Sequence, residues 1–249
     1  MAKKPVKKAN NRQFAGALVA VALVGVAALG YVLTHRGPTV IIVDPKIPAG
    51  AAEGHLMGNP NAPVQVLEFG DFECPGCGTF ATLTEPDVRS RLINTGVVGF
   101  RFYDFPLTQH KNTFTAHLAA ACADDQQKFW EMHDRIYAGQ DEWSDLVSPS
   151  MTDPLSIFKR YAKELGLDVK SWESCVTTQK YTAKIMGNQA EGVRRNVQTT
   201  PTLIIGNKQV NGVTYDQFKQ LVDSALADAT KAKADSARKP AAGKKGATK

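Results

Sequence analysis

The part of the chain that we expect to fold lacks an excess of positive charge. The 249 residues carry a formal net charge of +6, but residues 1–13 contribute +5 and residues 229–249 contribute +6, which leaves −5 for residues 14–228. Recognition of nucleic acid depends on Lys and Arg clustered on a folded surface. The distribution of charge therefore argues against nucleic acid as a partner.

Cysteine and histidine are scarce, with 4 and 5 residues respectively. Cys74 and Cys77 form a CxxC pair, a spacing that is also half of many zinc sites. A copper site built on the same thiols would need a His or Met close by, and neither is adjacent to the pair in sequence. We therefore expect no metal and no organic cofactor, and a copper-binding chaperone is the weaker alternative.

Charge is absent from residues 14–33, a run of twenty residues. In a helix that rises ~1.5 Å per residue, such a run spans ~30 Å, the thickness of the apolar core of a bilayer. Because the Lys and Arg residues precede the run, the positive-inside rule places residues 1–13 in the cytoplasm as a basic tail and the rest of the chain outside. We predict a single-pass transmembrane anchor in the cytoplasmic membrane. A signal peptide cleaved near Ala28-Leu29-Gly30 is the alternative, and it also exports the domain.

The flanks of the main domain have the composition of a linker and a tail. Residues 34–57 are rich in Pro, Gly and small residues, which predicts an extended linker, although residues 39–43 are compatible with a short edge strand. A turn cluster at residues 59–63 opens the main domain, which we place at residues 58–232. Residues 233–249 contain no large apolar residue, so they cannot offset the entropy of ordering, and we expect a disordered basic tail.

Segments typical of strands and helices follow one another in an order that predicts an α/β fold. Apolar or alternating patterns predict strands at residues 64–72, 97–105, 200–205 and 208–213, the last two joined as a hairpin. Apolar residues at helical spacing predict helices at residues 80–92, 112–138, 155–165, 169–177, 181–195 and 215–232, with a kink at Pro86 in the first. A block of helices at about residues 107–195 is thus inserted between the second strand and the C-terminal hairpin.

The tetrapeptide Cys74-Pro75-Gly76-Cys77 lies between the first predicted strand and the first predicted helix. The unpaired N–H groups and the dipole at the start of a helix favour negative charge. A thiol in that position can have a pKa of roughly 3.5–7.5, and the thiolate is the attacking species. Cys74 is therefore predicted to be a nucleophile at neutral pH.

Glu68 is the polar residue on its face of the first predicted strand. Residues 64, 66, 70 and 72 share this face and carry no polar side chain. Burial raises the pKa of a carboxyl group and would suit Glu68 to passing a proton to or from Cys77. A structural salt bridge is the alternative role.

Thr200-Pro201 opens a predicted strand. Only about 5–6% of X-Pro bonds in folded proteins are cis, so an ordinary trans proline at a strand start is the simpler interpretation. A cis bond would turn the backbone groups of Thr200 toward whatever docks beside the dithiol.

Cys122 and Cys175 both lie in segments predicted to be helical. An exported chain is expected to pair its cysteines, and four cysteines allow three connectivities. The close spacing of Cys74 and Cys77 favours the pairs 74–77 and 122–175. Two free buried thiols are the alternative for the second pair.

Together these segments resemble the thioredoxin superfamily and, within it, the membrane-tethered DsbA-like thiol–disulfide oxidoreductases. The resemblance covers residues 58–227 and implies a thioredoxin-like fold with an inserted helical domain. It rests on five segments in this order: Ala62-Pro63-Val64, Val66-Leu67-Glu68-Phe69, Phe72-Glu73-Cys74-Pro75-Gly76-Cys77, Lys128-Phe129-Trp130-Glu131-Met132-His133-Asp134, and Thr200-Pro201-Thr202 with Ile205-Gly206-Asn207.

The resemblance implies a role for each site residue. Cys74 is the exposed attacking thiol, Cys77 the buried resolving thiol and Glu68 the buried acid of the family. The Thr200-Pro201 bond is implied to be cis and to keep the dithiol accessible to substrate. By the same resemblance, Cys122 and Cys175 are the extra pair that stabilises the helical block in some relatives.

We therefore expect an extracytoplasmic oxidoreductase that introduces disulfides into exported proteins by exchange through a mixed disulfide with Cys74. Its expected partners are exported protein thiols or disulfides, a membrane redox partner that reoxidises or reduces the dithiol, and the membrane itself through residues 14–33. Many DsbA-type relatives carry His between the two cysteines, where this chain has Pro75-Gly76. Because redox poise depends on how well the reduced form is stabilised, an isomerase or reductase is an alternative. An anchored interaction protein with a permanently oxidised pair is another.

Overall fold

The computed structural model of the protein describes residues 11–34, 40–42, 52–147 and 154–238. The chain divides into two compact units, residues 1–37 and residues 38–249. In the first unit the helix α1 (Asn11–Thr34) covers the run predicted to be an anchor. Within the ranges described, no helix has the length and apolar character needed to cross a membrane, so the structure does not support the predicted transmembrane anchor.

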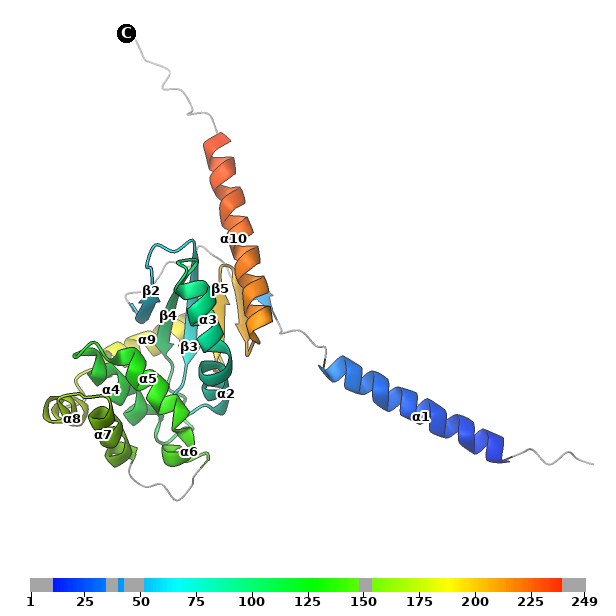
Figure 1. Ribbon diagram of the computed structural model, residues 1–249, viewed down its shortest axis with the longest axis horizontal. Helices are drawn as coiled ribbons and strands as arrows, with labels where there is room; N and C mark the ends of the chain where they lie inside the picture. The colour runs from blue at the N-terminus through cyan, green and yellow to red at the C-terminus, as the bar shows by residue number, and fades with distance from the viewer. Residues whose placement is uncertain (1–10, 35–39, 43–51, 148–153, 239–249) are drawn as a thin grey trace, which may run out of the picture. The chain divides into compact units, whose positions relative to one another are not determined.

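The second unit is built around a mixed sheet (Figure 1). The described residues form six strands in the order β1-β6-β5-β3-β4-β2. Their bounds are β1 (Ile41–Ile42), β2 (His55–Gly58), β3 (Val64–Gly70), β4 (Val98–Asp104), β5 (Thr202–Ile205) and β6 (Lys208–Asn211). Only β3 and β4 run parallel, and the other neighbours in this sheet are antiparallel. Central position explains the nearly continuous apolar sequence of β3, since a strand covered on both faces has no solvent side.

The chain leaves β3 through the CPGC tetrapeptide and enters an unbroken helical path. Its segments are α2 (Pro75–Thr79), the π-helical η1 (Phe80–Thr84), α3 (Glu85–Val88) and the π-helical η2 (Arg89–Ile93). The predicted helix therefore begins earlier than expected, at Pro75, and π-helical turns lie on both sides of Pro86. A π-turn is a common way for a helix to absorb a local irregularity such as a proline without an N–H group. Gly96, with φ +77°, follows the end of the path.

Every described element between β4 and β5 is a helix, as the order of predicted elements implies. These helices are α4 (Thr113–Asp124), α5 (Phe129–Ala138), α6 (Gln140–Trp143), α7 (Pro154–Glu164), α8 (Val169–Thr177) and α9 (Thr182–Arg194). The segment predicted as helical at 112–138 is two helices, because the chain turns between them at Gln127, with φ +58°. A disulfide joins Cys122 of α4 to Cys175 of α8, with 5.8 Å between their Cα atoms. This pairing is the one that the resemblance implied.

The flanking predictions need two corrections. Residues 55–57 belong to β2, which pairs with β4, so the fold begins inside the predicted linker. Helix α10 (Tyr215–Arg238) continues past residue 232 into the predicted disordered tail, whose residues 239–249 lie outside the described ranges. The short edge strand expected at 39–43 is present as β1, which pairs with β6.

Helices cover both faces of the sheet and bury the residues that lead to the CPGC tetrapeptide (Figure 1). On one face, Val64 and Val66 of β3 join a core with Phe80, Val88 and the α10 residue Phe218. On the opposite face, Phe69 of β3 packs with Tyr103 and Phe105, and helix α9 lies against β4. A third core lies mainly within the helical insertion and reaches Phe72 and Cys77. The dithiol therefore lies where the sheet meets the insertion.

Candidate active site

Cys74 and Cys77 lie at the start of the helical path that follows β3, and both are free thiols. Cys74 is the N-cap residue of α2, with extended backbone (φ −73°, ψ 122°), and its side chain is partly exposed. Cys77 lies one turn into the helix and is fully buried. One thiol can meet a substrate and the other cannot.

The surroundings of Cys74 favour its thiolate form. The pKa of the Cys74 thiol is lowered to about 5, first because Cys77 donates a side-chain hydrogen bond to its sulfur. Burial opposes this shift, whereas the Thr200 side chain and the backbone N–H groups of Cys77 and Gly76 support it. A hydrogen bond to the charged form of a group lowers the pKa of an acid. Cys74 is therefore a thiolate at neutral pH when the dithiol is reduced.

The surroundings of Cys77 instead favour its neutral thiol form. Its pKa is raised well above the ordinary value, first by burial, then by the hydrogen bond to Cys74 and the charges of Cys74 and Glu68. The backbone N–H of Asp71 donates to its sulfur at 3.5 Å and partly offsets the rise. A thiolate released at Cys77 therefore takes up a proton readily.

Thr200-Pro201 lies beside the dithiol, and the Thr200–Pro201 peptide bond is cis, as the resemblance implied. The Cys74 thiol donates a hydrogen bond to the carbonyl oxygen of Thr200 at 3.3 Å, across 126 residues of sequence. The two loops are in close contact, because a methyl group added at Gly76 would lie 3.3 Å from Cδ of Pro201. The fold thus brings together four of the predicted site residues, Cys74, Cys77, Thr200 and Pro201.

Glu68 is buried in the middle of β3, with 1% of its surface exposed. Its neighbours on the adjoining strands are apolar, Phe102 of β4 and Leu203 of β5. Burial raises the pKa of this carboxyl group well above its usual value, the negative charges of Glu85 and Cys74 raise it further, and Arg89 opposes the rise. Its Oε2 atom has no hydrogen-bond partner within the described ranges. Burial in this setting favours the protonated form of the carboxyl group, which can donate its proton.

Two buried carboxylates that the sequence reasoning missed hold the loop before Cys74. Asp71 and Glu73 are both fully buried. Asp71 accepts hydrogen bonds from the Thr113 hydroxyl at 2.6 Å, from the Leu107 N–H at 2.7 Å and from its near neighbour Glu73 N–H at 2.7 Å. The signal in the sequence was present, since both acids interrupt the apolar run that leads to Cys74.

Glu73 and Gln140 complete the attachment of this loop to the helical insertion. Glu73 accepts from the backbone N–H groups of Asn112 and Asp145, both at 2.7 Å. The Gln140 side chain donates to the carbonyl oxygen of Phe72 at 2.6 Å and to that of Cys74 at 3.1 Å. The backbone that presents Cys74 is therefore fixed by residues far along the chain.

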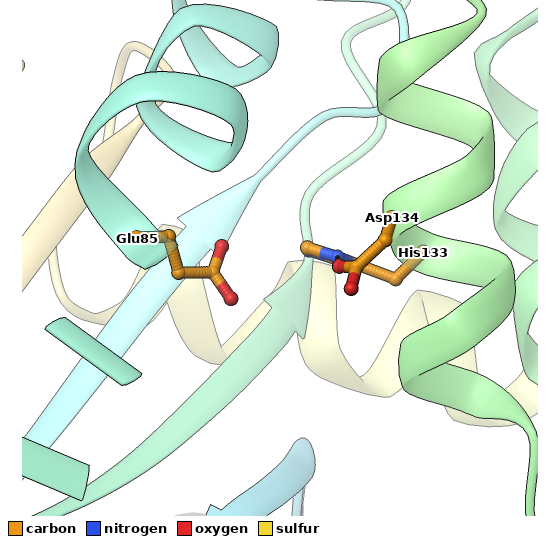
Figure 2. A group of neighbouring side chains, drawn as sticks. All are labelled: Glu85, His133 and Asp134. Carbon is orange, nitrogen blue, oxygen red and sulfur yellow. Dashed lines mark hydrogen bonds and ion pairs between the residues drawn. The ribbon is translucent and has the colours of Figure 1, made fainter. Parts of the chain in front are cut away.

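Glu85, His133 and Asp134 form a second group of polar residues, and Figure 2 shows the Glu85 carboxylate pointing toward His133 and Asp134 of another helix. One ligand atom from each of the three residues lies within 4.8 Å of the others, a spacing that could hold a metal ion. Arg89, however, donates to Glu85 at 2.8 Å and to Asp134 at 2.7 Å. The guanidinium group already supplies the positive charge, so these residues do not fit a metal centre.

The described histidines pair with carboxylates rather than with the thiols. His110 contacts Asp71 at 2.8 Å, and His117 contacts Asp104 at 2.7 Å. His55, on β2, also lies 3.4 Å from Asp104. These contacts are structural pairings between imidazole and carboxylate groups.

The sequence matches a family of known proteins over most of its length. Residues 51–224 fit the family model described as Thioredoxin. The chain belongs to the thioredoxin family. This membership agrees with the resemblance inferred from the CPGC and cis-proline segments, and it covers both the sheet and the helical insertion.

Two kinds of curated relative are similar to this thioredoxin-family chain. Disulfide bond formation protein D of Bacillus subtilis is 26% identical over 175 residues, which is 69% of this chain and 76% of that protein. Na(+)/H(+) antiporter NhaA 3 of Salinispora tropica is 32% identical over 192 residues, which is 76% of this chain but 27% of the antiporter. The chain thus spans only about a quarter of the antiporters that it matches.

Solved structures with the same fold include DsbA-type proteins. Oxidised BdbD from Bacillus subtilis aligns with a TM-score of 0.63 and 22% identity, over 76% of this chain and 98% of that one. Wolbachia pipientis alpha-DsbA1 aligns with a TM-score of 0.66 and 19% identity, over 76% and 98%. These likenesses establish a thioredoxin-like fold with a helical insertion.

Proposed function

We propose that this chain is a thiol–disulfide oxidoreductase that introduces disulfides into exported proteins by exchange through Cys74 and Cys77. The observation that carries the proposal is the contrast between the two thiols. Cys74 is partly exposed and its pKa is lowered to about 5, whereas Cys77 is fully buried and its pKa is raised. The names of the curated relatives called disulfide bond formation protein D support the same reaction.

The reaction follows from this contrast. A substrate thiolate attacks Sγ of Cys74 in the oxidised protein, the bond between Cys74 and Cys77 breaks, and its electron pair passes to Cys77. The buried Cys77 thiolate then takes a proton, for which Glu68, whose charge acts on Cys77, is the predicted donor. A second substrate thiolate attacks the substrate sulfur of the mixed disulfide and releases Cys74 as a stabilised thiolate. The substrate has then lost two electrons and gained a disulfide, and the protein is reduced.

A cavity beside the dithiol suits a polypeptide substrate. Its volume is about 450 Å³, and its lining includes Gly76, Phe80, Leu83, Val213 and Tyr215. Leu83 leaves 74% of its surface exposed there. An apolar surface next to the attacking thiol would bind unfolded segments with little dependence on their sequence.

The low pKa of Cys74 supports the oxidising direction. A well-stabilised thiolate stabilises the reduced dithiol, and a stable reduced form makes the disulfide a stronger oxidant. Hydrogen bonds from Cys77, Thr200 and the backbone N–H groups of Cys77 and Gly76 provide this stabilisation without the His that many relatives carry between their cysteines. A membrane redox partner would then be needed to reoxidise the protein.

The proposed location is outside the cytoplasm. The disulfide between Cys122 and Cys175 is of the kind that persists in oxidising compartments. The uncharged run at residues 14–33 is the segment that would direct export. Labelling of Cys74 in intact cells by a maleimide that does not cross membranes tests this location, and protection of Cys74 until the cells are lysed would contradict it.

Three measurements on the purified protein test the function. Cys74→Ser should abolish oxidation of a reduced cysteine-containing peptide, whereas Cys77→Ser should accumulate mixed disulfides because no resolving thiol remains. The reduction potential should lie nearer the strongly oxidising value of about −120 mV than the value of about −270 mV typical of thioredoxin. Full activity of Cys74→Ser would disprove the assignment of the nucleophile, and a potential near −270 mV would identify a reductase.

A further inference from the structure

The backbone of Asp71 contacts both cysteines of the dithiol. Its N–H group donates a hydrogen bond to Sγ of Cys77 at 3.5 Å, and its carbonyl oxygen accepts one from the N–H group of Cys74 at 3.0 Å. In the described part of the chain, this Asp71 N–H group is the one hydrogen-bond donor to Sγ of Cys77. The backbone of Asp71 therefore contacts the sulfur that leaves when the disulfide opens.

The side chain of Asp71 holds this backbone in place. It is fully buried, and each of its two oxygens accepts two hydrogen bonds. Oδ1 accepts from the hydroxyl group of Thr113 at 2.6 Å and from the N–H group of Glu73 at 2.7 Å. Oδ2 accepts from the N–H group of Leu107 at 2.7 Å and from Nδ1 of His110 at 2.8 Å, which carries the ring proton because a carboxylate only accepts. All of the roughly four acceptor sites of a carboxylate are thus occupied.

Three of the four donors come from the start of the helical insertion. Leu107 and His110 lie between β4 and α4, and Thr113 is the first residue of α4. His110 leaves 9% of its side chain exposed, and Thr113 is buried, so water has little access to these contacts. Hydrogen bonds in such a setting are stronger than in water. The insertion is therefore joined to the sulfur of Cys77 through one buried carboxylate.

The Asp71 N–H group interacts differently with the two states of Cys77. A neutral sulfur is a weak acceptor, whereas a thiolate is charged and accepts a stronger, charge-assisted hydrogen bond. When a substrate thiolate attacks Sγ of Cys74, negative charge develops on Sγ of Cys77. A donor that already points at this atom stabilises the transition state more than the ground state, which is the condition for a faster reaction.

We propose that Asp71 stabilises the Cys77 thiolate as it leaves, through its backbone N–H group, and that Thr113 and His110 are positioning residues that hold this group on the sulfur. The proposal rests on the proposed function. The electron pair of the broken bond goes to Cys77, a new S–S bond joins Cys74 to the substrate, and no oxidant or reductant enters besides the substrate thiols. Thr113 and His110 bond to the Asp71 carboxylate rather than to either sulfur, so they act through Asp71.

The test compares two reactions of the full chain at Cys74. Excess glutathione reduces the oxidised protein and expels Cys77, whereas iodoacetamide alkylates the reduced protein and breaks no bond to Cys77. Thr113→Val removes the hydroxyl donor and His110→Leu removes the imidazole donor, and each should slow reduction roughly three- to tenfold. Alkylation should stay within about twofold of the wild type, because it depends on the Cys74 thiolate alone. A general disturbance of the CPGC loop would slow both reactions.

Conservative replacements at the same positions show whether the hydrogen bonds are responsible. Thr113→Ser keeps the hydroxyl group and His110→Asn keeps an N–H donor near the place of Nδ1, so both should restore the rate of reduction close to that of the wild type. His55→Leu is the control for loss of a buried imidazole beside a carboxylate, since His55 lies 3.4 Å from Asp104 on the edge strand β2. It should leave the rate of reduction unchanged.

Wild-type rates of reduction in Thr113→Val and His110→Leu would overturn the proposal. Equal slowing in the conservative variants, or equal slowing of alkylation, would also overturn it, because the effect would then not depend on the hydrogen bonds or on Cys77. If Thr113→Val does not fold, His110→Leu and His110→Asn decide.

Failure of the proposed function has a different signature. A wild-type protein that forms no mixed disulfide at Cys74 would overturn the function and this inference with it. Normal exchange at Cys74 with unchanged rates in Thr113→Val and His110→Leu would overturn only the role of Asp71.

Discussion

The reactivity of Cys74 depends on hydrogen bonds that come from two distant parts of the chain. The backbone N–H groups of Gly76 and Cys77 belong to its own helix, whereas the Thr200 side chain belongs to the loop before β5. Since the folded-state pKa is lowered, the thiolate stabilises the reduced protein above the pKa of an unfolded thiol, near 8.5, and this stability is lost as pH falls through about 5.

Thr200→Val should therefore raise the pKa of Cys74 by roughly 0.5–1 unit, because the variant loses the hydroxyl group that contributes to the lowering. The pH dependence of alkylation of the reduced protein measures this pKa. Thr79→Val is a suitable control, since the Thr79 hydroxyl donates to the carbonyl oxygen of Pro75 at 3.0 Å instead. An unchanged alkylation profile in Thr200→Val would contradict the role of the hydroxyl.

Glu68 lowers the stability of the protein at alkaline pH. Its folded-state pKa is raised above the unfolded value, mainly by burial, so ionisation of Glu68 favours the unfolded chain. The cost begins above the unfolded pKa of about 4.3 and grows until pH passes the folded-state pKa.

Glu68→Gln should accordingly match the wild type in stability near pH 4 and exceed it by about 1–3 kcal/mol near pH 9. Urea unfolding of the reduced proteins at the two pH values measures the difference. A wild type that becomes more stable than Glu68→Gln as pH rises would mean that Glu68 is ionised and paired, as in the salt-bridge alternative, rather than held neutral.

At the scale of elements, the sequence predicts those parts that depend on local pattern. The apolar runs of β3 and β4, the β5–β6 hairpin and the helices α7, α8 and α9 appear within a few residues of their predicted positions. Strand β2 was not predicted, because its four residues show no alternation of apolar and polar side chains. They form a strand only because they pair with β4. The π-helical turns were missed because they depend on packing around Pro86.

The residues of the candidate site likewise fall into those that local sequence pattern identifies and those that only the folded structure reveals. The CxxC spacing and the isolated acid on β3 identify Cys74, Cys77 and Glu68 in the sequence. Asp71 interrupts the apolar run that leads to Cys74, but Glu85 carries no such signal, because a carboxylate on a helix is usually exposed. Their burial follows from the insertion, which brings residues more than thirty positions away against them, Leu107 at Asp71 and Asp134 at Glu85.

Helix α9 approaches the sheet closely at Gly192. A methyl group there would lie 2.5 Å from the ring of Phe105 and 2.9 Å from the ring of Phe69. Gly192→Ala should therefore lower the free energy of unfolding by about 1–3 kcal/mol, because a packed interior resists added volume.

Gly187 of the same helix provides the control, since nothing lies within 4 Å of an added methyl group. Gly187→Ala should raise stability by about 0.5–1 kcal/mol through helix propensity. Urea unfolding of both variants measures the pair of effects. A gain in stability for Gly192→Ala would show that α9 can move away from the sheet.

At the scale of the whole molecule, the site forms only when the sheet and the insertion are folded together. Gln140 reaches the CPGC loop from within the insertion and Thr200 from the loop that follows it, and Asp71 and Glu73 anchor the CPGC loop to the insertion. The insertion is itself closed by one covalent bond, between Cys122 and Cys175, which are separated by 53 residues. This bond constrains the unfolded chain, whereas the contacts of the CPGC loop are non-covalent.

Replacement of both Cys122 and Cys175 by Ala should consequently lower the free energy of unfolding by about 2–4 kcal/mol, because the unfolded chain regains the entropy of the open loop. At temperatures where the variant remains folded, the rate of exchange at Cys74 should stay within about twofold of the wild type, since the disulfide joins the C-terminal end of α4 to α8 and neither helix carries a predicted site residue. Urea unfolding and peptide oxidation measured on the same samples separate the two effects. Equal stability with a lower exchange rate would reverse the assignment and place Cys122 and Cys175 in the transfer of electrons.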